Sequence, residues 1–121
     1  MINVDYKDRR PIYEQLTANI TELALSGELR PDQQLPSVRQ LASQLGINPN
    51  TISKAYIELE RRGIVYSVSG KGSFVNSDLS AAAGDRLSET EQKLRECIRD
   101  MKRIGADKNR LLEIIEEEFG K

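Results

Sequence analysis

Histidine and tryptophan are absent from this sequence of 121 residues, and cysteine occurs once, at Cys97. Without histidine the chain lacks the side chain that most often serves as a general base, and no Cys/His catalytic pair can form. No cluster of metal-binding residues has the usual spacing. A single cysteine cannot form an internal disulfide, which is typical of a reducing compartment, and we expect Cys97 to be a small buried apolar residue. Enzymatic activity, a metal and a cofactor are therefore not expected, although catalysis by carboxylates alone is left open.

Long apolar runs are also missing. No stretch approaches the roughly 20 apolar residues that a membrane-spanning helix needs, and the residues after Met1 do not form a secretory signal. The segment Gly70-Lys71-Gly72 lacks the glycine spacing and the Lys-Ser/Thr pair of a nucleotide-binding loop. We therefore expect a cytoplasmic protein without a membrane partner.

A strongly basic balance, which many DNA-binding proteins have, is not found either. The formal net charge is −1, and residues 1–76 carry nine Lys or Arg against eight Asp or Glu. Affinity for nucleic acid depends on where the basic side chains lie rather than on their total. A binder with this composition should show modest affinity that depends strongly on salt.

The strongest helix signals lie in the middle of the chain. Ser37 is a good N-cap, since its hydroxyl can accept from a backbone N–H of the first turn, and apolar residues then recur at helical spacing until Gly46. Asn48 is a second N-cap, and Pro49 fits the first helical position because its missing N–H costs nothing there. Two helices joined by such a short turn form the helix-turn-helix pattern. A further amphipathic helix, at residues 11–26, is expected to support them.

A β-hairpin is predicted directly after these helices, which makes the unit a winged helix-turn-helix. Apolar residues that alternate at the period of a strand are Ile64, Tyr66 and Val68. In the turn Gly70-Lys71-Gly72 the two glycines allow positive φ, and the lysine places charge at the tip. Phe74 begins the return strand, and a short strand near Gln34 is expected to join the hairpin as a third.

The second helix of the pair is the candidate recognition helix, because readers of the major groove use the N-terminal residues of such a helix. Asn50 can bond a base edge, Lys54 a guanine or a phosphate, and Arg39 either of these through a bidentate contact. Each residue alone is equally well explained as part of a solvated face, but the group together with the basic hairpin tip favours DNA. Ile57 lies nearer the polar face than a core residue should. The candidate DNA-binding residues are Ser37, Arg39, Asn48, Asn50, Thr51, Ser53, Lys54, Gly70, Lys71 and Gly72.

The remainder of the chain predicts a linker and two amphipathic helices. Residues 77–87 lack core periodicity, Ser88 and Glu91 form a capping-box pattern, and Asp107 is expected to cap the second helix. Two short helices have too little core to fold alone, so they must pack on residues 1–76, on a second chain, or on both. We favour a homodimer. The candidate dimerisation residues of region 88–121 are Leu94, Ile98, Met101, Leu111, Leu112, Ile115 and Phe119.

Five segments in order resemble the N-terminal domain of the GntR family of bacterial transcription regulators. They are residues 11–16 (PIYEQL), 35–42 (LPSVRQLA), 48–56 (NPNTISKAY), 59–65 (LERRGIV) and 70–75 (GKGSFV). The Asn-Pro-Asn-Thr helix start, followed by a short tail in place of a large effector domain, is similar to the YtrA-type subfamily. The resemblance implies a dimeric regulator, usually a repressor, often of transporter operons.

The sequence thus predicts an α+β, mostly α fold: a winged helix-turn-helix domain followed by a two-helix dimerisation tail. The predicted function is a homodimeric repressor that binds a palindromic double-stranded DNA operator. Two half-sites about one DNA turn apart would suit paired domains. The alternative is a winged-helix module that binds proteins without reading DNA. Whether a small-molecule effector acts on the tail is left open. A third possibility is that the chain is the N-terminal part of a larger regulator, but a short tail that ends in its own amphipathic helix argues against it.

Overall fold

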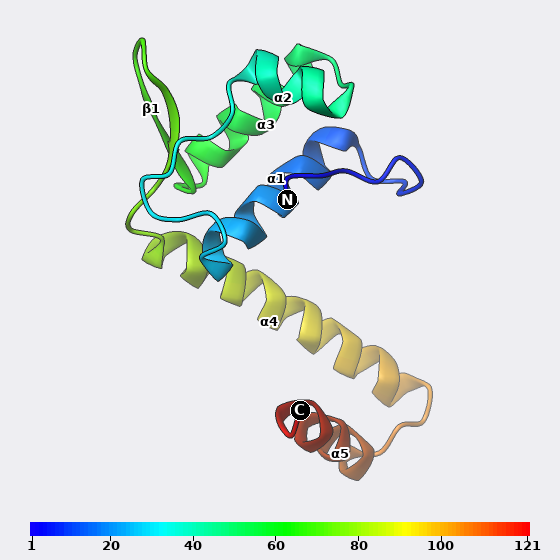
Figure 1. Ribbon diagram of the computed structural model, residues 1–121. Coiled ribbons are helices and arrows are strands. Elements are labelled where there is room, and N and C mark those ends of the chain that lie inside the picture. The colour runs from blue at the N-terminus through cyan, green and yellow to red at the C-terminus, as the bar shows by residue number, and fades with distance from the viewer. The chain divides into compact units, whose positions relative to one another are not determined.

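The computed structural model describes all residues from 1 to 121 and contains five helices and two strands (Figure 1). It divides into two compact units, the N-terminal unit Met1–Ala83 and the C-terminal unit Gly84–Lys121. The fold is α+β and mostly helical, as predicted. None of the helices is long and apolar enough to cross a bilayer.

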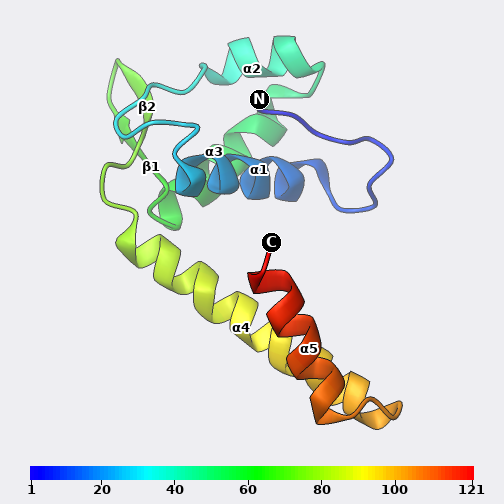
Figure 2. The same cartoon turned by 60° about the horizontal axis from the view of Figure 1, so that its bottom comes forward.

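Helix α1 (Ile12–Ser26) is the support of the N-terminal unit. Its side chains at helical spacing, Leu16 and Ile20 among them, are fully buried in the core. Gly27 ends the helix in the left-handed conformation, with φ of 84°. Helix α3 (Pro49–Arg61) packs against both α1 and α2 (Val38–Leu45), so the core lies where these helices meet (Figure 2).

The helix-turn-helix forms as its local signals predict. Helix α2 (Val38–Leu45) begins with a full capping box, in which Ser37 and Gln40 each accept a hydrogen bond from the other's backbone N–H. Helix α3 (Pro49–Arg61) begins with the Asn48 side chain accepting from the Asn50 N–H at 2.8 Å. Tyr56 fixes the two helices together, because its hydroxyl donates to the Pro36 carbonyl at 2.6 Å. The buried face of α3 consists of Ile52, Ala55, Tyr56 and Leu59.

The wing consists of β1 (Val65–Val68) and β2 (Gly72–Val75), which pair antiparallel from Val65 opposite Val75 to Val68 opposite Gly72. The predicted third strand is present as a bridge between Gln34 and Phe74. Burial does not follow the expected alternation of Ile64, Tyr66 and Val68, because Ile64 and Val65 are both buried at the start of β1. Tyr66 instead stacks on Phe74 with ring centroids 5.5 Å apart, on the half-exposed side of the hairpin.

The predicted linker and helix start near residue 88 were wrong, because helix α4 spans Ser80–Arg103. Asp78 accepts hydrogen bonds from the backbone N–H and the hydroxyl of Ser80, which satisfies the helix start, and three alanines follow with high helix propensity. The predicted capping pair Ser88 and Glu91 therefore lies inside a continuous helix. Helix α5 (Lys108–Phe119) is capped by Asp107 as predicted.

The C-terminal unit contains no fully buried residue. Cys97 is exposed, which corrects the expectation that it is buried. The physical reason is that within this chain no further layer of side chains covers α4 at that position. The apolar residues that were expected to form a dimer interface are half-buried at most, as Leu94 and Phe119 show with exposed fractions of 55% and 88%.

Candidate nucleic-acid interface

The polar candidate DNA-binding residues of α3 lie near its N-terminus. Asn50 is exposed, while Thr51 and Ser53 are half-buried. The side chains of Ser37 and Asn48 already accept hydrogen bonds as N-caps. Their remaining donors, the hydroxyl proton of Ser37 and the amide protons of Asn48, are the groups left to meet a phosphate. Both helix N-termini also present backbone N–H groups, which favour anions.

Two cations among the candidate residues form no ion pair. Arg39 lies in the first turn of α2 and is exposed, and Lys71 lies at the exposed tip of the wing. Neither side chain has a hydrogen-bond or ion-pair partner in the structure, so each can contact a phosphate or a base without first breaking a salt bridge. We regard these two as the strongest electrostatic elements of the candidate interface.

Three arginines of the N-terminal unit are engaged in ion pairs. Arg61 and Arg62 both bind Glu58, and their hydrogen bonds lower the pKa of that carboxyl to about 2. Arg10 binds Asp8 at 2.8 Å, which lowers the pKa of the aspartate. These pairs are solvent-exposed and individually weak, yet they reduce the positive field that the sequence alone would suggest.

Lys54 has a different partner. Its ammonium nitrogen lies 3.8 Å from the centre of the Tyr13 ring on α1. An exposed cation–π contact contributes on the order of 0.5–1 kcal/mol, so a phosphate contact by Lys54 would have to replace it. The DNA role of Lys54 stays a prediction. Tyr13 was not identified from the sequence, because residues 13 and 54 are far apart and share no local pattern.

The wing tip is held by a second long-range contact. Gly70 and Gly72 adopt φ of 75° and 122°, positive values that glycine tolerates and that the sequence predicts for this turn. The Gln34 side chain donates to the Lys71 carbonyl at 2.8 Å. A Cβ at Gly72 would lie only 3.0 Å from the Gln34 amide nitrogen. Gln34 therefore braces the tip from outside the hairpin, and sequence reasoning missed this role.

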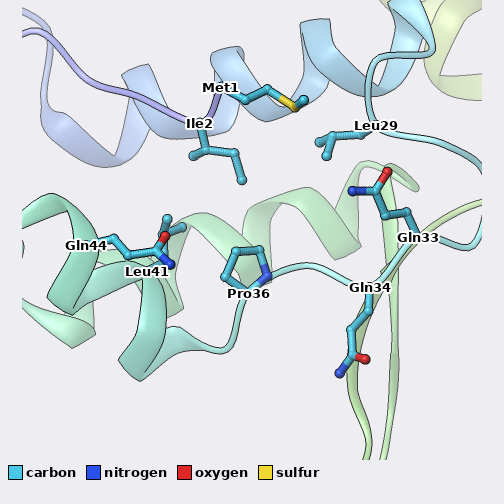
Figure 3. Close-up of a pocket in the computed structure, with 8 residues that line it drawn as sticks. All are labelled: Met1, Ile2, Leu29, Gln33, Gln34, Pro36, Leu41 and Gln44. Atoms are coloured by element: carbon cyan, nitrogen blue, oxygen red, sulfur yellow. The ribbon is translucent and has the colours of Figure 1, made fainter.

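Figure 3 shows the open cavity beside this brace, with a volume of about 280 Å³. Gln33 points toward Leu29 and the cavity, whereas the Gln34 side chain runs along the hairpin (Figure 3). No acidic or basic side chain lines the cavity, and no group of three His, Cys, Asp or Glu residues in the structure could hold a metal ion. Its lining residues are Met1, Ile2, Leu29, Gln33, Gln34, Pro36, Leu41 and Gln44.

Comparison with known proteins agrees with this arrangement. Residues 12–75 match the family described as bacterial regulatory proteins, gntR family. The chain belongs to the GntR family. It is 37% identical over 118 residues to the transcriptional repressor YtrA of Bacillus subtilis, covering 97% of this chain and 91% of the relative. GntR proteins are DNA-binding regulators of transcription, so the chain is not an enzyme, as predicted.

Two solved structures of GntR-like proteins extend the comparison. A transcriptional regulator from Oenococcus oeni has a TM-score of 0.82 and 30% identity, with 96% of this chain and 97% of that chain covered. The DNA-binding domain of AraR in complex with operator ORE1 has a TM-score of 0.53 and 33% identity, with 62% of this chain and 92% of that one covered. The first likeness includes both helices after the wing, and the second concerns the DNA-binding part.

Proposed function

We propose that this GntR protein is a homodimeric repressor that reads a palindromic operator with the N-terminal half of α3. In this arrangement Asn50, Thr51 and Ser53 face base edges or phosphates in the major groove. Arg39 and the helix N-termini hold the flanking backbone, and Lys71 reaches the backbone or minor groove from the wing tip. The observation that carries the proposal is the exposed polar start of the capped helix α3, together with two exposed candidate cations that have no ion pair, Arg39 in the first turn of α2 and Lys71 at the wing tip.

The dimer half of the proposal is supported by the C-terminal unit. Leu94, Ile98 and Met101 recur at helical spacing on α4 and are all partly exposed, as are the four candidates on α5. Exposure of such an apolar stripe to water is unfavourable, and covering it with another surface lowers the free energy. A second copy of the chain is the simplest cover, because it would also pair two reading helices on a two-fold symmetric site.

The test is fluorescence anisotropy on the duplex that the protein selects from a random DNA pool, compared with scrambled duplex over a salt series. We expect at least ~10³-fold preference for the selected duplex and a steep logarithmic dependence on salt. Arg39→Ala should weaken binding without changing the fold. Arg103→Ala is the matched control, since it removes the same charge on the side of α4 away from Leu94.

Unchanged binding by Arg39→Ala would overturn the assignment of that residue. Weak and equal binding to both duplexes by the unmodified protein would overturn DNA reading, and would favour the protein-interaction module. DNA binding by such a dimer could be regulated by an effector, since a ligand that altered the tail helices would change the spacing of the paired DNA-binding units. Thermal-shift screening against metabolites tests for such an effector. Mapping of bound sites in the genome tests whether a transporter operon is regulated.

A further inference from the structure

Ile57 is the large apolar residue of the recognition helix α3 that is exposed to solvent. Its side chain is 69% exposed, although the other aliphatic residues of α3, Ile52 and Leu59, are fully buried. It follows Asn50 by seven residues, or about two helical turns, so the two side chains share the face opposite the core. Within the N-terminal unit the other exposed large apolar residues are Met1, Tyr6 and Val68, and none of these lies in a helix.

The fold gives no reason for an isoleucine at this position. It is not among the apolar residues packed on the core, and a β-branched side chain is a weaker helix former than alanine or leucine. One exposed aliphatic side chain among polar neighbours is also far too small for a protein interface. Its size suits contact with a single small apolar group on whatever surface α3 meets.

We propose that Ile57 is a specificity-determining residue that contacts the 5-methyl group of a thymine. This inference rests on the proposed function, in which α3 enters the major groove, and it extends the reading surface from the N-terminal half of α3 to Ile57 in its C-terminal half. The thymine methyl is the apolar group that base pairs display in that groove. Seven residues at 1.5 Å rise span about 10 Å, so Ile57 reads a base pair up to about three steps from the one that Asn50 reads, at 3.4 Å per step.

The charges around Ile57 are compatible with this role. Glu58 is bound by Arg61 and Arg62, which neutralise its carboxylate. Glu60, on the other side, accepts a hydrogen bond from the Ser67 hydroxyl of the wing at 3.2 Å. The balanced charge of Glu58 therefore repels a phosphate backbone less, and the carboxylate of Glu60 is held toward the wing.

The test uses the duplex selected from a random pool, with each thymine replaced singly by deoxyuridine, which removes the methyl group and keeps the base pair. For the unmodified protein we expect the dissociation constant to rise about fourfold at one thymine in each half-site, the value for one buried methyl. Ile57→Ala removes the contact in both half-sites of the proposed homodimer, so it should bind the thymine duplex roughly 16-fold more weakly, and deoxyuridine at that position should have no further effect. Ile57→Val, which keeps branched methyls, should retain most of the sensitivity.

Ile57→Ala that binds as tightly as the unmodified protein, or that keeps the full response to deoxyuridine, would overturn the proposal. Arg39→Ala on the same duplex separates this result from failure of the proposed function. If Arg39→Ala weakens binding and Ile57→Ala does not, DNA reading stands and the thymine contact is wrong. If no duplex is selected at all, both the function and the contact are wrong.

Discussion

The two units differ most in what they bury. The N-terminal unit has a contiguous core of fully buried aliphatic side chains from three helices and the wing, whereas the C-terminal unit has no buried residue. Hydrophobic burial is the main favourable term in folding, so the first unit can be stable by itself and the second cannot. This difference is consistent with our proposal that the N-terminal unit reads DNA and that the C-terminal unit is stabilised by a partner.

The largest expected effect is on the core of the reader. Leu59→Ala removes a fully buried side chain, and we expect a loss of about 2–5 kcal/mol in the free energy of unfolding. Leu112→Ala makes the same change in the tail, where the side chain is 47% exposed, and should cost much less at protein concentrations that keep the chain monomeric. Chemical denaturation measures both. Equal losses would mean that the tail has a core of its own.

The next effect concerns the tail stripe. Ile98→Asp places a carboxylate in the middle of the apolar residues of α4, and we expect the dimer dissociation constant to rise by roughly 100-fold or more, since an unpaired charge would be buried. Gln92→Asp is the matched control, because it adds the same group on the opposite side of the helix. Sedimentation equilibrium decides between them. Equal weakening by both variants would place the interface elsewhere.

Substitution of one glycine in each unit by alanine should change the stability of the protein in opposite directions. Gly72→Ala forces an alanine to φ of 122° and toward the Gln34 amide, so it should destabilise by about 1–2 kcal/mol and disturb the wing tip. Gly84→Ala lies within α4 with no atom near its Cβ, and should stabilise the helix by about 0.5–1 kcal/mol. Thermal unfolding gives both signs. Stabilisation by Gly72→Ala would show that the tip is not held in this conformation.

Sequence reasoning succeeded where the signal is local. Ser37, Gly46 and Asn48 act within one turn of the chain, and each has the predicted cap geometry. It failed at the start of α4, because alanines and polar residues there have no apolar period to detect, and Ser88 with Glu91 matches a capping box by chance inside the helix. The partners of the site, Gln34 for Lys71 and Tyr13 for Lys54, lie tens of residues apart. No local pattern could indicate them, and the DNA contacts themselves stay predictions.

The smallest expected effect concerns how the two units use charge. Glu58→Gln weakens the carboxylate's hold on Arg61 and Arg62, so both should become available to phosphates and tighten operator binding by a few-fold at low salt. Glu113→Gln makes the same change beside Arg110 in the C-terminal unit and should leave DNA affinity unchanged. Anisotropy titrations over a salt series compare the two variants. Equal tightening by both would indicate a general effect of net charge rather than a reading surface.

Glu58 also makes the stability of the protein depend on pH, in a direction that follows from its lowered pKa. Because the folded-state pKa of Glu58 is lowered from 4.5 to about 2, its contribution to stability is fully present above about pH 4.5 and is lost as the pH falls toward 2. Glu58→Gln should therefore flatten the acid side of the stability curve within that window, by a small amount because the pair is exposed to solvent. Denaturation measured at several pH values from 2 to 6 checks this. If the Glu58 carboxyl titrates near 4.5 by NMR, the ion pairs with Arg61 and Arg62 do not form in solution, and both arginines are already available to DNA.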